Sequence, residues 1–91
     1  MAPIRVLIAD DMGLHRERLR RLLERQGDIE VIGEASSPEE VLQRGGQREP
    51  DVVLMDLRMP RHDPKGGIRA TQQLALNHPA VKVIALTESD D

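Results

Sequence analysis

Short apolar runs alternate with amphipathic stretches along the chain. The runs are IRVLIA at 4–9, IEVIGEA at 29–35, DVVLMD at 51–56 and VKVIAL at 81–86. Each has the length of a strand and is rich in β-branched residues. The first run is almost continuously apolar, which is typical of a strand that is buried on both faces. We therefore predict four strands.

The stretches between these runs predict three helices, at 12–26, 36–46 and 68–78. The first repeats leucine at helical spacing, and the second begins with serine, proline and two glutamates, as helix N-termini often do. We expect this second helix to end at the paired glycines Gly45 and Gly46. Pro79 closes the third helix.

The predicted order is strand-helix-strand-helix-strand-helix-strand. Such alternation is typical of an α/β fold with a parallel sheet and right-handed crossovers. The 91 residues suffice for one domain only, so we expect a doubly wound parallel sheet over residues 1–91.

Composition narrows the functional classes. Aromatic residues are absent, so the core must be built from aliphatic side chains. The net charge of −3 lacks the basic excess of a nucleic-acid-binding face, and the absence of cysteine excludes disulfides and thiolate metal sites. No apolar run reaches the roughly 20 residues of a membrane helix, and the N-terminus does not read as a signal peptide. We expect a cytoplasmic protein without membrane contact.

Carboxylates directly follow two of the predicted strands. Asp10 and Asp11 come after the first run, and the third run ends on Asp56. Ligands of open parallel sheets bind beyond the carboxyl ends of the strands, where the strand order reverses. If the chain starts in the middle of the sheet and winds both ways, these carboxylates gather at one edge together with Thr87.

Each of these residues taken alone has an ordinary structural explanation, because an aspartate after a strand is commonly a turn former. Three close carboxylates, however, repel one another unless a cation lies among them. Ligands that offer only oxygen favour Mg²⁺. A metal on Asp10 and Asp11 would leave Asp56 to act as a nucleophile that forms an aspartyl phosphate. The nearby His62 is better explained as a solvated loop residue than as a ligand.

Four stretches, in this order, resemble the receiver domain of bacterial two-component response regulators: VLIADD, VVLMDLRMP, GIRATQQL and VIALT. The stretch EVIGEASSPEEVL further resembles the subfamily in which a C-terminal helix-turn-helix domain binds DNA. The resemblance implies a flavodoxin-like fold. It also implies a signalling switch rather than a turnover enzyme, one that assists only its own phosphorylation and dephosphorylation.

The resemblance also implies roles for single residues. Asp56 would accept a phosphoryl group from a sensor histidine kinase. Asp10, Asp11, Asp56 and the backbone carbonyl of Arg58 would hold Mg²⁺, and Thr87 would be the switch residue. Arg58 would also tune dephosphorylation.

Ser89 occupies the second position that tunes dephosphorylation in the family. Glu88 departs from the family, which usually has a small residue there, and its charge would repel a phosphoryl donor. The 57–67 loop is longer than usual and borders the crevice. These features leave open an atypical receiver-like module that dimerisation or a small ligand regulates without phosphorylation. A hydrolase is disfavoured because a second aspartate placed as general acid and a glycine-rich phosphate loop are both missing.

The resemblance implies a further helix, a fifth strand with a functional lysine and a last helix beyond the strand at 81–86. Lys65 and Lys82 are not placed to replace that lysine. We therefore interpret the chain as a receiver truncated after its fourth strand. Without a fifth strand, residues 81–86 would form an open edge through which chains self-associate or form a homodimer.

Overall fold

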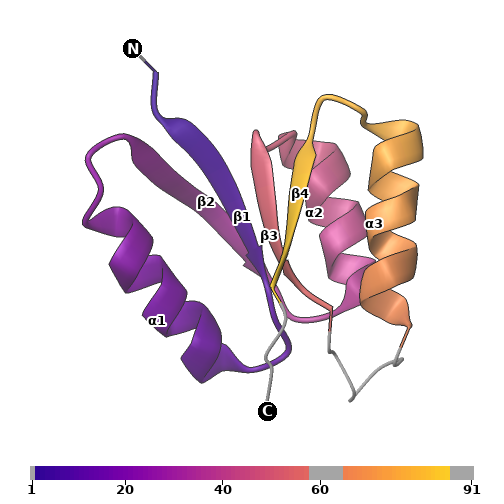
Figure 1. Ribbon diagram of the computed structural model, residues 1–91, viewed down its shortest axis with the longest axis horizontal. Coiled ribbons are helices and arrows are strands. Elements are labelled where there is room, and N and C mark those ends of the chain that lie inside the picture. The colour runs from indigo at the N-terminus through magenta and orange to yellow at the C-terminus, as the bar shows by residue number, and fades with distance from the viewer. Residues whose placement is uncertain (1, 58–64, 87–91) are drawn as a thin grey trace.

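The computed structural model describes residues 2–57 and 65–86, which form a parallel sheet and three helices (Figure 1). Its strands are β1 (Ile4–Ala9), β2 (Ile29–Ala35), β3 (Val52–Asp56) and β4 (Lys82–Leu86), and its helices are α1 (Gly13–Glu24), α2 (Pro38–Arg48) and α3 (Gly66–Asn77). The predicted alternation of strands and helices is confirmed. None of the helices among the described residues has the length and apolarity needed to cross a membrane.

The strand order in the sheet is β2-β1-β3-β4, and all three pairings are parallel. The chain therefore starts in the middle, moves outward to β2 and returns across β1 to β3. Because β1 and β3 are neighbours, the residues that follow their carboxyl ends lie side by side. This is the point where the strand order reverses, as the doubly wound prediction requires.

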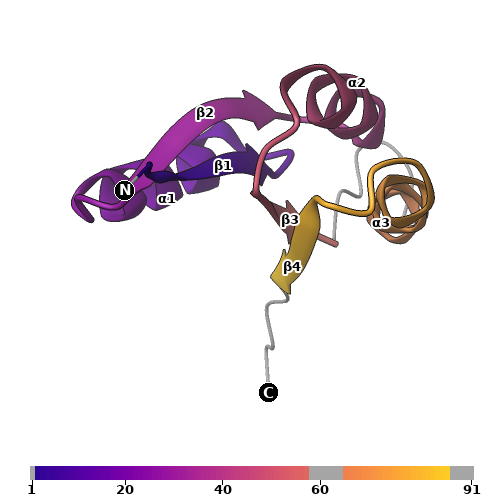
Figure 2. The same cartoon turned by 90° about the horizontal axis from the view of Figure 1, so that it is seen from above.

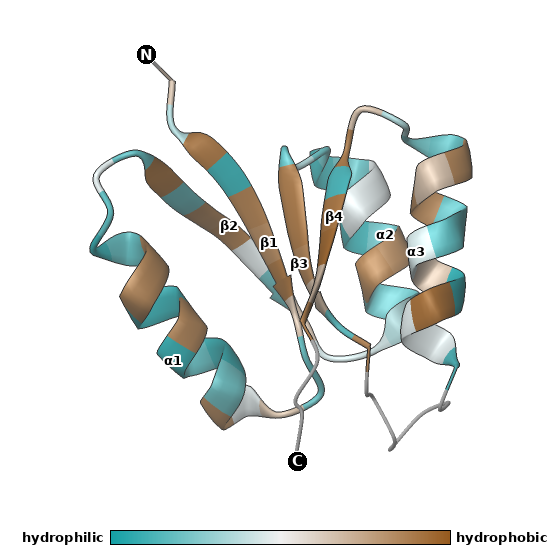
Figure 3. Cartoon of the chain, in the orientation of Figure 1, coloured by the Kyte–Doolittle hydropathy of each residue, from teal (hydrophilic) through white to brown (hydrophobic). Residues whose placement is uncertain are grey.

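The helices cover the two faces of the sheet unequally. Helix α1 lies on one face, beside β1 and β2, and α2 and α3 lie on the other (Figures 1 and 2). Apolar residues predominate in the strands, with hydrophilic bands in β1, β2 and β4, whereas in the helices they alternate with hydrophilic residues (Figure 3). Helix α1 has no fully buried residue, whereas both α2 and α3 have several. The α2–α3 side therefore holds the tighter core.

That core is aliphatic, as the composition predicts. Leu7, Val53 and Met55 from the sheet are fully buried against Val41 of α2 and Leu74 of α3. Burying one such side chain is worth roughly 1.5–3 kcal/mol, so this cluster holds α2 and α3 onto the sheet.

The predicted end of the second helix is wrong, because α2 continues through Gly45 and Gly46. A Cβ atom at Gly45 would lie 3.1 Å from the Leu74 side chain, and one at Gly46 would lie 3.2 Å from the ring of His78. The two glycines let α3 approach α2 closely and do not stop the helix. The helix ends instead at Glu49, whose φ of 43° is left-handed.

The two outer strands, β2 and β4, differ in the side chains that contact or flank their backbones. Two backbone carbonyls of β2, those of Ile32 and Glu34, accept hydrogen bonds from Arg48 and Arg44 of α2. On the other outer strand, β4, the side chain of Ile84 is half exposed. Arginine side chains thus use two backbone hydrogen-bond acceptors of the edge strand β2, which reduces its capacity to pair with another chain.

Candidate metal and phosphorylation site

Three carboxylates meet at the carboxyl ends of β1 and β3. Asp10 and Asp11 directly follow β1, and Asp56 is the last residue of β3. Each offers one oxygen, and these oxygens all lie within 4.8 Å of one another. The structure thus brings together the three aspartates that the sequence singles out, since neighbouring parallel strands deliver their C-terminal residues to the same edge.

Asp10 is almost completely buried, with 4% of its surface exposed. Its Oδ1 accepts a hydrogen bond from the backbone N–H of Met12 (2.9 Å), and its Oδ2 lies 3.3 Å from Nδ1 of His15. Its backbone carbonyl accepts from Nη1 of Arg16 at 2.7 Å. The first turns of α1 therefore fix both the side chain and the main chain of Asp10.

An ion-pair network extends this arrangement to β2. Arg16 donates from Nε to Oε1 of Glu34 at 2.9 Å, and Nη2 of Arg20 lies 3.2 Å from Oε2 of the same residue. Arg16 thus joins the backbone of Asp10 to a side chain at the end of β2. Since α1 buries no residue completely, these polar contacts help to hold it on the sheet.

Sequence reasoning missed His15 and Arg16, because the residues from 12 onward read mainly as a leucine stripe with a charged outer face. Their positions, five and six residues after Asp10, could have indicated that they contact it. When a helix starts directly after a strand, the residues of its first turn lie close to the end of that strand. His15 and Arg16 are in this first turn.

Asp11 and Asp56 are partly exposed, so they face the open side of the cluster. Asp56 is paired in register with Leu86 of β4, and the N–H of Leu57 lies 3.5 Å from the Leu86 carbonyl oxygen. The end of β4 therefore lies beside the end of β3. Lys82 lies at the opposite end of β4, which agrees with the prediction that it does not serve this site.

Five residues named from the sequence lie outside the described part of the chain: Arg58, His62, Thr87, Glu88 and Ser89. Most of the 57–67 loop also lies outside it. Their roles stay predictions.

Helix α3 starts against the chain segment that leaves Asp56. A Cβ atom at Gly67 would lie 2.9 Å from Cα of Leu57 and 3.3 Å from the backbone oxygen of Asp56. Real Cβ atoms essentially never come that close, so only glycine fits here without a backbone shift. This contact places Leu57, the residue after the candidate phosphoacceptor, against the start of α3.

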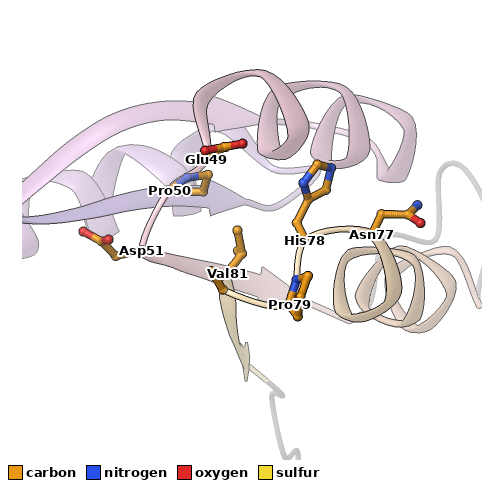
Figure 4. A pocket seen from close by; sticks show the side chains of 8 residues that line it. Glu49, Pro50, Asp51, Asn77, His78, Pro79 and Val81 are labelled. Carbon is orange, nitrogen blue, oxygen red and sulfur yellow. The ribbon is translucent and has the colours of Figure 1, made fainter.

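A cavity of about 310 Å³ lies at the amino ends of β3 and β4 (Figure 4). The cluster of Asp10, Asp11 and Asp56 lies at the opposite, carboxyl ends of the strands. Glu49, Asp51 and His78 are among its lining residues. The Asp51 carboxylate accepts from the backbone N–H of Arg5 at 2.8 Å, and the Arg5 side chain donates to the backbone oxygen of Glu49. These polar groups join β1 to the start of β3, which is a structural role.

The donor set of the carboxylate cluster fits Mg²⁺. It offers three closely spaced oxygens and no sulfur, and the ion prefers carboxylates, waters and phosphate oxygens. The buried carboxylate, Asp10, is contacted by Met12 and His15 at one point on each oxygen, which leaves lone pairs for a cation.

Residues 6–91 match the response regulator receiver domain family, and the chain belongs to that family. It is 42% identical over 88 residues to response regulator GacA of Pseudomonas viridiflava, covering 97% of this chain and 40% of GacA. It is 36% identical to transcriptional regulatory protein LnrK of Bacillus subtilis, covering 97% of this chain and 39% of LnrK.

Among solved structures, a two-component response regulator of the LuxR family from Aurantimonas sp. SI85-9A1 matches with a TM-score of 0.87. Its identity to this chain is 31%, and the match covers 98% of this chain and 61% of that one. The predicted flavodoxin-like receiver fold and the predicted family are thus confirmed. The chain spans about two fifths of the length of the curated relatives named above.

Proposed function

We propose that this chain is the phosphoacceptor module of a two-component response regulator and that Asp56 is the residue phosphorylated. The observation that carries the proposal is the convergence of Asp10, Asp11 and Asp56 at the carboxyl ends of two neighbouring strands. Membership of the receiver family supports it. The module acts as a switch in the cytoplasm and has no turnover activity of its own.

The chemistry is an in-line displacement at phosphorus. A carboxylate oxygen of Asp56 forms a bond to the phosphorus of the donor, and the bond from phosphorus to the leaving group breaks. In the natural reaction that leaving group is the histidine nitrogen of a sensor kinase. Three carboxylates would repel an incoming phosphoryl group, so the site needs a counter-charge.

Asp10, Asp11, Asp56 and the backbone carbonyl of Arg58 would hold Mg²⁺. When bound, the ion neutralises the negative charge that develops on the phosphoryl oxygens. Met12 and His15 hold the two oxygens of Asp10, and the partly exposed Asp56 is the carboxylate that would react with the donor.

Phosphorylation would then shift a two-state equilibrium. Thr87 directly follows β4, and the last residue of β4 is paired with Asp56, so its hydroxyl is the group we propose to turn toward the phosphoryl oxygens. Arg58 and Ser89 would tune dephosphorylation, and Glu88 would slow access of the donor.

The partners follow from this role. A sensor histidine kinase would donate the phosphoryl group, and chains would self-associate or form a homodimer through the edge strand β4. Control of transcription, and with it DNA binding, would come through an output domain outside these residues. The curated relatives support this, since one of them is a transcriptional regulatory protein more than twice as long as the matched part.

The test is intact-mass measurement of the longest form of the protein that its gene encodes, after incubation with acetyl phosphate and Mg²⁺. We expect one phosphoryl adduct in the unmodified protein and none in Asp56→Asn. Asp28→Asn, an exposed aspartate before β2, is the matched control and should be phosphorylated normally. A folded protein that forms no adduct would refute the proposal and favour regulation without phosphorylation.

A further inference from the structure

His15 lies in the first turn of α1, and its ring faces the buried carboxylate of Asp10. Nδ1 of His15 is 3.3 Å from Oδ2 of Asp10. The Asp10 side chain is only 6% exposed and that of His15 is 31% exposed. The ring therefore lies between the carboxylate and solvent, and water has little access to Oδ2 from that side.

The two oxygens of Asp10 are held by different groups. Oδ1 accepts from the backbone N–H of Met12, a contact that any residue at that position except proline could make. In the part of the chain that the structure describes, the side chain that contacts Oδ2 is that of His15. An ionised carboxylate only accepts, so this hydrogen bond requires the proton on Nδ1.

These two contacts leave oxygen lone pairs available to a cation. Each carboxylate oxygen has about two lone-pair sites, and one hydrogen bond at each oxygen leaves one site on each. Held at both oxygens, the carboxylate cannot rotate freely about its bond to Cβ. Its orientation relative to Asp11 and Asp56 is thus set before a cation arrives.

We propose that His15 is a positioning residue for divalent-cation binding: it holds Oδ2 of Asp10 in the orientation in which the three carboxylates converge. This inference rests on the proposed function, since it concerns the same carboxylates. His15 is not one of the three residues whose ligand atoms converge, and its Nδ1 contacts Asp10. Residues that orient a metal ligand in this way typically change metal affinity by about 10–100-fold when they are replaced.

The test is the dissociation constant for Mn²⁺, a spectroscopic substitute for Mg²⁺, measured from the paramagnetic resonance signal of free Mn²⁺. The protein is again the longest natural form. We expect His15→Leu, which removes the donor, to raise the dissociation constant about tenfold. His15→Asn keeps an N–H donor near the position of Nδ1 and should restore binding to near the original value.

Two controls separate positioning from general loss of structure. Gln26→Leu makes a comparable polar-to-apolar change beyond the far end of α1 and should leave Mn²⁺ binding unchanged. The urea midpoint of each variant, measured without metal, shows whether it is folded. A purely structural role would lower the urea midpoint of both His15 variants without the recovery of metal affinity in His15→Asn.

The outcomes distinguish the two proposals. Unmodified protein that binds no Mn²⁺ would overturn the metal site and, with it, the role of His15. Normal Mn²⁺ binding together with an unchanged or tighter dissociation constant in folded His15→Leu would overturn the role of His15 alone. Failure of His15→Asn to recover binding would likewise show that the hydrogen-bond donor is not what matters.

Discussion

Single residues set the geometry of this site through contacts that are close and few. Asp10 is oriented by Met12 and His15, and its backbone is tied to β2 through Arg16 and Glu34. None of these contacts buries much apolar surface, so their contribution is to position groups rather than to provide bulk stability.

Gly67 provides a test at the residue scale. Alanine normally favours a helix over glycine by about 1 kcal/mol. At Gly67 the added Cβ would meet the backbone of Leu57 at 2.9 Å, so we expect Gly67→Ala to lower the free energy of unfolding by about 1–3 kcal/mol. Urea unfolding would measure this change. The backbone oxygen of Asp56 lies near the same Cβ, so phosphorylation should slow as well.

Gly27→Ala is the matched control for this prediction. Gly27 lies after the end of α1, and a Cβ atom added there would have no neighbouring atom within 4 Å. It should leave stability unchanged or raise it slightly, because alanine restricts the unfolded chain. If both variants unfold at the same urea concentration, the close approach at Gly67 does not lower the free energy of unfolding of Gly67→Ala as expected.

At the scale of elements, the start of α2 shows how a helix end is stabilised. The side chain of Ser37 accepts from the N–H of Glu40 at 3.2 Å, as an N-cap residue does. The Glu40 carboxylate in turn accepts from both the backbone N–H (2.8 Å) and the hydroxyl of Ser36. The serine cap that the sequence predicts is therefore present, and Glu40 reinforces it.

These contacts give α2 a pH dependence. The hydroxyl hydrogen bond from Ser36, followed by the backbone N–H, holds the pKa of Glu40 below its ordinary value of 4.5. A carboxyl group whose pKa is lowered by folding stabilises the protein above its unfolded pKa, and this stabilisation is lost as the pH falls through the folded pKa. Glu40→Gln should therefore be less stable than the unmodified protein at neutral pH, with the difference shrinking as the pH falls below 4.5.

Thermal unfolding between neutral pH and about pH 3 would measure the difference, since this range spans the carboxyl pKa values. The matched control is Glu39→Gln, which changes the neighbouring, exposed glutamate. It should follow the unmodified protein through the acidic range. A Glu40→Gln curve that stays parallel to the unmodified one at every pH would contradict the lowered pKa of Glu40.

At the scale of the whole molecule, the two edges of the sheet are unequal. Arg44 and Arg48 bond to backbone carbonyls of β2, whereas the outer strand β4 carries the half-exposed Ile84. An edge strand with exposed apolar residues is a template for pairing with another chain. We propose that the 91-residue chain self-associates through β4.

Sedimentation velocity at several protein concentrations would test this proposal. We expect the sedimentation coefficient to rise with concentration, and Ile84→Lys to reduce that rise, because a lysine in an edge strand disfavours pairing. Leu22→Lys changes an apolar residue of α1 that is slightly more exposed than Ile84, and this variant should behave like the unmodified chain. A monomer at every concentration would exclude association through β4.

The elements, their order and the position of the three aspartates at the carboxyl ends of strands can all be predicted from the amino-acid sequence. Apolar runs and helical spacing are local signals, and the rules for parallel crossovers turn their order into a topology with few alternatives. Parallel strands direct their carboxyl ends to the same edge, which places Asp10, Asp11 and Asp56 there. Their closeness also requires β1 and β3 to be neighbours, which the strand order of the structure shows.

Contacts between segments that are distant along the chain set the remaining features, and these contacts exist only in the folded protein. Gly45 reads locally as a helix stop, but the approach of Leu74 from α3 keeps it inside α2. His15 reads, like Leu14, as a residue that extends the leucine stripe toward the start of the helix, and the docking of α1 beside β1 places its ring against Asp10. Local sequence patterns indicate which secondary structure each segment prefers. Packing between the elements decides which side chains come into contact, and the geometry of the candidate metal site depends on these contacts.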